Sequence, residues 1–181
     1  ATPLSDSIVK LRRLQEANGS IRKTQLLREF QDDANFRNFL YYALNPMLTY
    51  KISEQTLRSP TRYDSAITLT MTDIFSVCEL LSKRKALDAG TVYQVCAFVQ
   101  SSPPDEADVY IKLLSKTLRL GVTAKTVNKV IPNLIPEWEV QQAYPIDKYP
   151  LKEGTEFWLT QKLNGVRATY YKGRLYARSG V

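Results

Sequence analysis

Prolines divide this chain into two parts with different hydrophobic periods. Four of its nine prolines fall within residues 132–150: Pro132, Pro136, Pro145 and Pro150. No amphipathic period survives in that stretch, because proline lacks a backbone N–H and fixes φ, so it interrupts helices and sheet interiors. Residues 132–150 are therefore predicted to be a stiff linker between a domain at 1–131 and a second piece at 151–181.

The first 131 residues carry apolar side chains at the spacing of amphipathic helices. Ile8, Leu11 and Leu14, for example, share one face of the first periodic segment. Residue types that begin helices precede or open the successive segments: Ser5, Ser20, Asn35, Thr70 or Thr72, Thr91, the pair Pro103-Pro104, and Thr123. This part is therefore predicted to be an all-helical domain.

After residue 150 the hydrophobic period changes to that of β-strands. Residues 157–162 are predicted to form one strand. Residues 167–171 and 174–178 are predicted to pair as an antiparallel hairpin, because Lys172-Gly173 is a two-residue turn signal. The predicted fold class is mainly α, with a short antiparallel β piece at the end of the chain.

Histidine is absent from the sequence. Its absence excludes Ser-His and Cys-His catalysis and His-ligated zinc, and two cysteines alone do not make a zinc site. Cys78 and Cys96 both fall on apolar faces of predicted helices, so buried, reduced thiols are expected. No resident metal site is predicted, and any chemistry must use lysine, arginine, carboxylates or an imported metal.

The formal net charge of +7 favours a polyanionic partner or substrate. No run of 18 or more apolar residues is present, so no membrane-spanning helix is expected. No signal-peptide pattern opens the chain, because Ile8-Val9 is followed at once by Lys10. A partner such as nucleic acid fits these properties, and a membrane does not.

The most informative motif is the segment Gln161-Lys162-Leu163-Asn164-Gly165-Val166-Arg167. A lysine amine must be unprotonated to attack a phosphate, and burial or a nearby cation lowers its pKa. Gly165 would let the backbone approach a nucleotide closely, and Arg167 would stabilise charge on the phosphate oxygens. The alternative is a plain hairpin in which Asn164-Gly165 is an ordinary turn and the cations are surface residues.

This spacing strongly resembles the Lys-x-Asp-Gly-x-Arg motif of the nucleotidyltransferases that include DNA ligases, RNA ligases and mRNA capping enzymes. Their second motif, Ser-Arg-x-Gly, is similar to Ala177-Arg178-Ser179-Gly180. The resemblance implies that Lys162 takes up AMP from ATP with the help of Mg²⁺. It implies the following nucleotide-site residues: Thr160, Gln161, Asn164, Gly165, Arg167 and Arg178.

The chain departs from the family pattern at three positions. Asn164 stands where the family has aspartate, so it keeps the size and one acceptor but loses the charge. Ala177 replaces the serine of the second motif, and Thr160 stands where many relatives carry a glutamate that reads the adenine amine. The replacement at Asn164 bears on activity, and the replacement at Thr160 bears on recognition of the base.

The helical domain upstream of the lysine distinguishes among these enzymes. Residues 118–122 and 129–136 resemble the end of the DNA-binding domain of ATP-dependent DNA ligases, most closely those of T-even-type bacteriophages. The resemblance implies that 1–131 binds duplex DNA around a nick and that 151–181 begins an adenylation domain. The expected DNA contacts surround a helix, a glycine turn and a second helix: Lys112, Lys116, Arg119, Gly121, Lys125 and Lys129.

The function implied by this resemblance is the sealing of nicks in double-stranded DNA through a lysyl-AMP intermediate. Such an enzyme would serve DNA replication, repair and recombination as a monomer in the cytoplasm of a bacterial host. The family's later motifs are expected beyond Val181, so this chain is not expected to seal nicks alone. Two alternatives remain: a DNA-binding module in which Asn164 marks an inactive site, and an RNA ligase with an unusual helical front.

Overall fold

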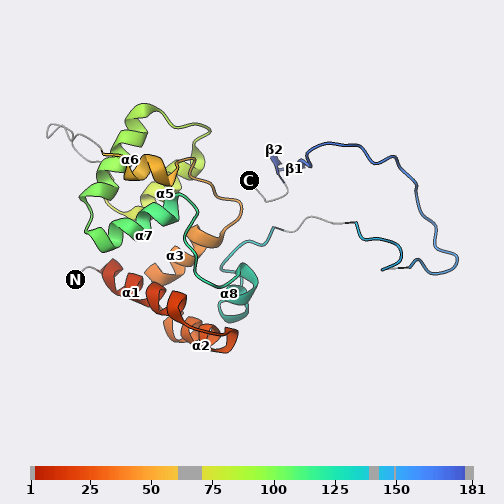
Figure 1. Cartoon of the computed structure of the whole chain (residues 1–181), viewed down its shortest axis with the longest axis horizontal. Helices are drawn as coiled ribbons and strands as arrows, with labels where there is room; N and C mark the ends of the chain where they lie inside the picture. Colours follow the sequence, from red (N-terminus) through yellow and green to blue (C-terminus); the bar gives the residue numbers. More distant parts are fainter. Residues whose placement is uncertain (1–2, 61–70, 139–142, 149, 178–181) are drawn as a thin grey trace. The chain divides into compact units, whose positions relative to one another are not determined.

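The computed structural model describes residues 3–60, 71–138, 143–148 and 150–177. The chain divides into two compact units, Ala1–Glu137 and Trp138–Val181, referred to as unit 1 and unit 2. Figure 1 shows the course of the chain through its helices and its two strands. The fold is mainly helical and ends in a two-stranded antiparallel hairpin, which confirms the predicted fold class.

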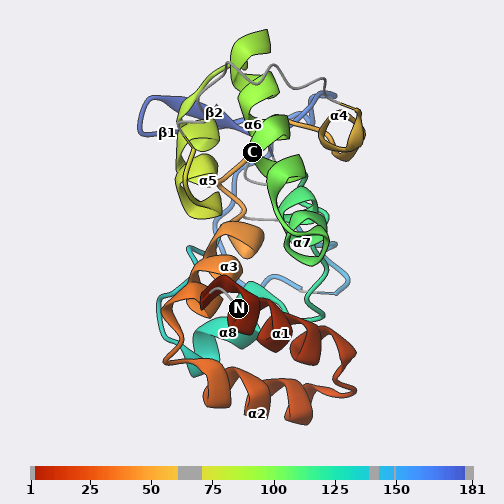
Figure 2. The same ribbon diagram turned by 90° about the vertical axis from the view of Figure 1, so that its left-hand side faces the viewer.

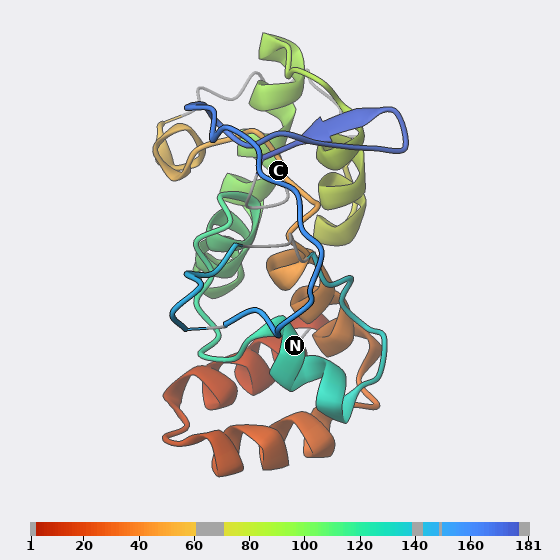
Figure 3. The same ribbon diagram turned by 90° about the vertical axis from the view of Figure 1, so that its right-hand side faces the viewer.

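The helices of unit 1 form two groups joined by α3 and α7. In chain order they are α1 (Pro3–Glu16), α2 (Ser20–Phe30), α3 (Ala34–Leu44), α4 (Glu54–Arg58), α5 (Ile74–Lys83), α6 (Ala89–Ser101), α7 (Pro104–Leu114) and α8 (Ala124–Val130). Helices α1, α2 and α8 lie at one end of unit 1, and α4, α5 and α6 lie at the other (Figures 2 and 3). Helix α3 packs against α1, α5 and α7, and α7 also packs against α1, α4 and α6.

A continuous apolar core runs through both groups of helices. Phe36 and Phe39 of α3 are completely buried. Phe36 meets Phe30 of α2 edge to face, with ring centroids 5.5 Å apart, and Phe39 meets Phe75 of α5 in the same way at 4.9 Å. Such aromatic pairs contribute about 0.5–1.5 kcal/mol each beyond their buried area. Helix α3 therefore links the two groups through its apolar face.

Three helices are capped by an aspartate close to the predicted helix start. Each aspartate accepts hydrogen bonds from backbone N–H groups of the first turn: Asp33 in α3, Asp73 in α5 and Asp88 in α6. The predicted caps Thr72 and Thr91 are wrong, because Asp73 and Asp88 accept these bonds and their charge suits the helix N-terminus. Asn35, predicted to open the third helix, is the second residue of α3. Thr70 lies outside the described residues.

The other predicted helix starts have mixed outcomes. Thr123 caps α8 as predicted and accepts from the N–H of Thr126. Helix α7 begins at Pro104 with Pro103 at its cap position, which confirms the proline signal. Ser5 lies inside α1 and does not cap it, whereas α2 begins at Ser20 as predicted.

Asp33 also joins α1 to the start of α3. Its carboxylate accepts from the Ser7 hydroxyl at 2.9 Å and from the Lys10 ammonium at 2.8 Å. Burial acts to raise the pKa of Asp33, but the hydrogen bonds from Lys10, Phe36 and Ser7 outweigh it and leave that pKa lowered. One charged side chain thus caps a helix and fixes its neighbour.

The two cysteines are buried and form no disulfide, which confirms the expected reduced thiols. Burial raises the pKa of Cys78 to about 12. Both thiols are therefore packing groups of the core and not exposed nucleophiles.

Asn128 fixes the segment that leaves α8. Its side-chain amide donates to the carbonyl of Ile135 at 2.8 Å, and its side-chain carbonyl accepts from the N–H of Ile135 at 3.0 Å. Ile135 is itself buried, at 2% exposure, so this pair of bonds is reinforced by burial. Asn128 also donates to the Glu137 carboxylate at 3.3 Å, so the chain is held to unit 1 as far as Glu137.

Unit 2 contains the predicted hairpin in a shorter form. Strand β1 (Thr169–Tyr171) pairs antiparallel with β2 (Arg174–Tyr176), with Tyr170 opposite Leu175. The turn residues Lys172 and Gly173 have φ values of 47° and 81°, as the twist-matched two-residue turn requires. The hairpin and its turn were therefore correctly predicted.

The strand predicted at residues 157–162 is wrong. This segment has no regular secondary structure, and the side chains of Trp158 and Leu159 are 95% and 89% exposed. A strand is stable only when its backbone groups pair with a neighbour, and the described residues of unit 2 offer no third strand to it. Apolar composition alone predicted a strand whose partner is absent from the described residues.

Trp138 packs on the hairpin of its own unit. Its ring lies 4.8 Å from that of Tyr176 and 6.5 Å from that of Tyr171, measured between centroids. Trp138 falls inside the stretch predicted as a linker, 132–150, but its contacts tie it to residues more than thirty positions later. The structure thus divides the chain between Glu137 and Trp138.

The role of Asp33 gives a first testable prediction. Asp33→Ala removes the cap of α3 and the partner of Ser7 and Lys10, and should lower the free energy of unfolding by about 2 kcal/mol. Urea unfolding at neutral pH measures this loss. Asp32→Ala, a neighbouring exposed aspartate, is the matched control and should change stability little. Equal effects of the two substitutions would contradict the assignment.

Candidate functional site

The residues of the lysine motif lie on an exposed segment of unit 2. Six of the predicted nucleotide-site positions are exposed, and the chain bends at Gly165: Thr160, Gln161, Lys162, Asn164, Gly165 and Arg167. The backbone at Gly165 is open, since a β-carbon there would meet nothing within 4 Å. Arg178, the seventh position, lies outside the described residues. The described part of unit 2 does not by itself enclose a nucleotide, so burial of the amine needs additional surface.

The predicted DNA contacts surround the connection between α7 and α8. After Leu114 the chain turns through Lys116, which has a left-handed φ of 59°. The N–H of Thr117 donates to the carbonyl of Lys112 at 2.9 Å, which closes the end of α7 in the manner of a Schellman motif. This closure directs residues 117–123 back towards α8.

All six predicted DNA contacts are exposed or partly exposed around this connection. Arg119, Gly121, Lys125 and Lys129 are exposed, and Lys112 is partly exposed. Lys112 forms an ion pair with Asp108 at 3.1 Å. Asp108 also accepts from Arg58 at 2.8 Å, and this bond, the largest influence, lowers its pKa together with the bond from Lys112. The charge of Lys112 is therefore partly offset.

Lys116 does not join the other five. Its ammonium points inward and donates to the carbonyl of Asn45 at 2.7 Å and, more weakly, to that of Tyr42 at 3.4 Å. It also lies 5.8 Å from the centre of the Tyr50 ring. Burial lowers the pKa of Lys116 to about 8. The expectation of a surface cation at this position does not match the geometry, because the amine caps the C-terminal end of α3.

Two side chains outside the predicted site hold the turn before α8. Gln15 of α1 donates to the carbonyl of Arg119 at 2.8 Å. Lys23 of α2 occupies the space that a β-carbon at Gly121 would fill. Both residues are about a hundred positions from the turn, so no local sequence pattern indicates these contacts. The packing of α2 against α8 brings Lys23 to the turn, and α1, which packs against α2, brings Gln15.

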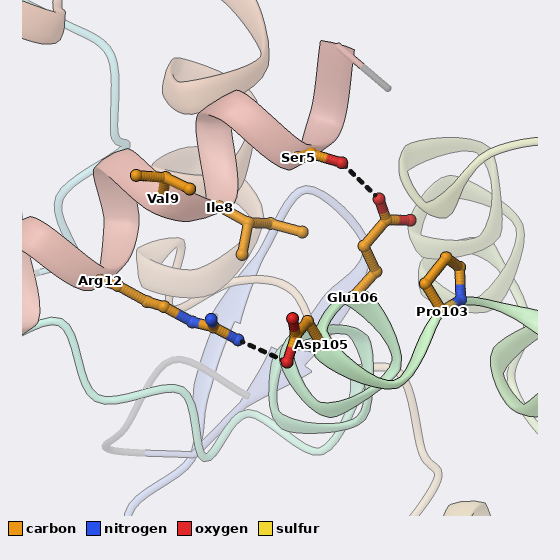
Figure 4. Close-up of a pocket in the computed structure, with 7 residues that line it drawn as sticks. All are labelled: Ser5, Ile8, Val9, Arg12, Pro103, Asp105 and Glu106. Carbon is orange, nitrogen blue, oxygen red and sulfur yellow. Dashed lines mark hydrogen bonds and ion pairs between the residues drawn. The ribbon is translucent and has the colours of Figure 1, made fainter. Parts of the chain in front are cut away.

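A separate cavity of about 320 Å³ lies between α1 and the start of α7 (Figure 4). Glu106 lies at this cavity and accepts from the Ser5 hydroxyl at 2.9 Å. Arg12 reaches Asp105 at 3.6 Å, where both side chains are largely exposed. These contacts join α1 to α7, and none of the predicted site residues lines the cavity.

Two further features concern the kind of site that this chain can carry. Among the described ranges, no three acidic or thiol side chains converge as a metal site. None of the described helices is both long enough and apolar enough to cross a membrane.

Comparison with known proteins finds a structural similarity. No family model matches the sequence, and no curated protein matches it. Among solved structures, a chain named Pmar-Lig_PreS3 matches with a TM-score of 0.56 and 21% sequence identity. The match covers 72% of this chain and 31% of that one, so this chain spans about a third of the length of the ligase-related structure that it resembles. At this identity the likeness establishes a shared fold.

The partly buried amine of Lys116 predicts a particular dependence of stability on pH. Between about pH 8 and the ordinary value of 10.5, the unfolded chain binds a proton at Lys116 that the folded chain does not. The contribution of Lys116 to the free energy of unfolding should therefore rise with pH across this window. The difference in stability between wild type and Lys116→Met should widen from pH 8 to pH 10, as measured by urea unfolding.

Lys129→Met, at an exposed lysine of α8, is the matched control for this measurement. Its stability should run parallel to that of the wild type over the same range. Near neutral pH, Lys116→Met should also cost about 1–2 kcal/mol, because the carbonyl of Asn45 loses its donor. Parallel curves for all three proteins would show that Lys116 is not buried in solution.

Proposed function

We propose that this chain is the N-terminal part of an ATP-dependent DNA ligase. In this proposal unit 1 binds duplex DNA around a nick, and unit 2 carries Lys162 as the amine that takes up AMP. The observation that supports it most is the likeness of 72% of the chain to part of a ligase-related structure. The order of residues around Lys162 supports it independently, because a motif in sequence and a likeness of backbone are separate properties.

The DNA-binding part of the proposal rests on the exposed cations near the α7–α8 connection. Arg119, Lys125 and Lys129 are exposed there, beside the exposed Gly121. Cations and backbone amides bind phosphate without reading bases, which suits an enzyme that acts at nicks in any sequence. Lys112 contributes less than these residues because Asp108 pairs with it. Lys116 is left out, because its amine serves the end of α3.

The nucleotide-binding part of the proposal rests on the motif. ATP and Mg²⁺ are the proposed cofactors, and Arg167 and Arg178 are the proposed phosphate contacts of the same site. Lys162 and its neighbours are exposed on a segment without regular structure. A nucleotide pocket therefore requires surfaces beyond the described residues. Phe157, Leu163 and Val166 are also exposed, at 61%, 83% and 94%, and such apolar side chains would pack against those surfaces.

A second candidate function is a DNA-binding module without nucleotidyl transfer. Asn164 favours it, because it lacks the carboxylate that the family carries at that position. In both candidate functions unit 1 binds DNA. They differ only in whether Lys162 takes up AMP. The ligase reading further proposes a monomer that seals nicks during replication, repair and recombination in the cytoplasm of a bacterial host.

Binding to nicked duplex DNA tests the part that both candidates share. The chain should bind with an affinity that falls as salt rises, with a log–log slope of about −0.9 per phosphate contact. Replacing Arg119, Lys125 and Lys129 together with alanine should flatten that slope. Fluorescence anisotropy over a series of salt concentrations measures it. An unchanged slope would place the DNA site elsewhere, and no binding to any duplex would remove the proposal.

Covalent labelling separates the two candidates. A protein in which this sequence continues into a full adenylation domain, incubated with ATP and Mg²⁺, should gain the mass of AMP on Lys162. Lys162→Ala should abolish the gain, whereas Lys172→Ala, at the exposed turn of the hairpin, should not. Mass spectrometry of the intact protein and of its peptides reads out the result. An unmodified Lys162 in such a protein would favour the binding module.

A further inference from the structure

Lys23 places a cation against the turn that precedes α8. The side chain comes from α2, which packs against α8 at the same end of unit 1 (Figure 3). Gly121 has a left-handed φ of 69°, and its missing side chain leaves the space into which the Lys23 ammonium extends. Any other residue at 121 would strain the backbone and displace that ammonium. The turn is thus shaped around the amine of Lys23.

The ammonium of Lys23 differs from the paired lysines nearby. Lys10 lies 2.8 Å from Asp33, and Lys112 lies 3.1 Å from Asp108. Within the described part of the chain, no carboxylate lies within ion-pairing distance of Lys23, although its side chain is only partly exposed. A partly buried cation without a counter-ion keeps its full attraction for an external anion.

The backbone of the same turn adds neutral donors. The carbonyl of Arg119 is held by Gln15 at 2.8 Å, which fixes the start of the turn. As far as the described residues go, the N–H groups of Gly121 and Val122 donate to no protein acceptor. Gly121 itself is exposed, so an oxygen from solution can reach this backbone. A fixed turn that presents donors beside a cation suits a tetrahedral anion.

We propose that Lys23 and the turn Arg119–Val122 together bind one backbone phosphate of duplex DNA. This inference rests on the proposed function of unit 1 and adds α2 to its DNA-binding surface. The ammonium of Lys23 supplies a point charge, and the N–H groups supply directed hydrogen bonds to phosphate oxygens. Neither group reads base edges, so the contact is independent of sequence.

Salt-dependent binding of the whole chain to a nicked duplex tests this contact. Lys23→Met removes the charge but keeps the apolar stem, and should make the log–log slope shallower by about 0.9. Lys23→Arg should keep the wild-type slope. The matched control is Lys85→Met, an exposed lysine of the loop after α5, which removes the same charge elsewhere. A slope for Lys23→Met equal to those of wild type and Lys85→Met overturns the inference.

A second measurement uses the wild-type protein and does not depend on the folding of a variant. Acetylation of lysine amines, read by mass spectrometry, should slow at Lys23 when the nicked duplex is added and should stay unchanged at Lys85. Equal rates at Lys23 with and without the duplex overturn the inference. If the wild type binds no duplex, the proposed function fails and this inference fails with it. If the wild type binds and only these two tests fail, the proposed function stands.

Discussion

A partly buried lysine amine connects two helices of unit 1 at the end of its central helix. Lys116 follows α7 in a left-handed conformation and sends its amine to the last carbonyls of α3. Tyr50 donates to one of the same carbonyls, that of Tyr42, at 2.7 Å. Carbonyl groups at a helix C-terminus carry partial negative charge and lack partners within the helix. The amine satisfies them and joins α7 to α3 where the two groups of helices meet.

The N-terminal end of α3 is also bonded by a charged side chain, in this case a carboxylate. Asp33 accepts from the first-turn N–H groups and is itself held by Ser7 and Lys10 of α1. The dipole of α3 is therefore compensated at both ends by side chains that also connect it to other helices. The apolar face between them packs against both groups. Helix α3 packs on α1, α1 packs on α2, and α2 packs on α8 beside the turn at Gly121.

Much of the fold was accessible from the sequence because it is local. Periodicity predicts a helical front, and Lys172-Gly173 predicts the hairpin, since both signals depend on neighbouring residues. Two wrong caps come from choosing Thr over a nearby aspartate, as at Asp73 and Asp88. The strand predicted at 157–162 fails because pairing depends on another segment.

The candidate site also depends on contacts between residues that are far apart in the sequence. Lysines 112 to 129 are close in sequence, and a cluster in sequence predicts a shared surface. A left-handed residue at the end of α7 turns Lys116 inward instead. Lys23 takes a place beside Gly121 from nearly a hundred residues away, and only the packing of α2 on α8 brings it there. A contact between residues so far apart cannot be predicted from the spacing of residues in the sequence.

The two anchors on either side of the unit boundary have a mechanical consequence. Ile135 is bonded to Asn128 in unit 1, and Trp138 is packed on Tyr176 in unit 2, so only Pro136 and Glu137 separate them. The proline ring fixes φ at one of these two residues. The Glu137 carboxylate also accepts from Asn128, at 3.3 Å, so this residue too is tied to unit 1. The proline-rich stretch is therefore not one free linker, because contacts within each unit hold its first part as far as Trp138.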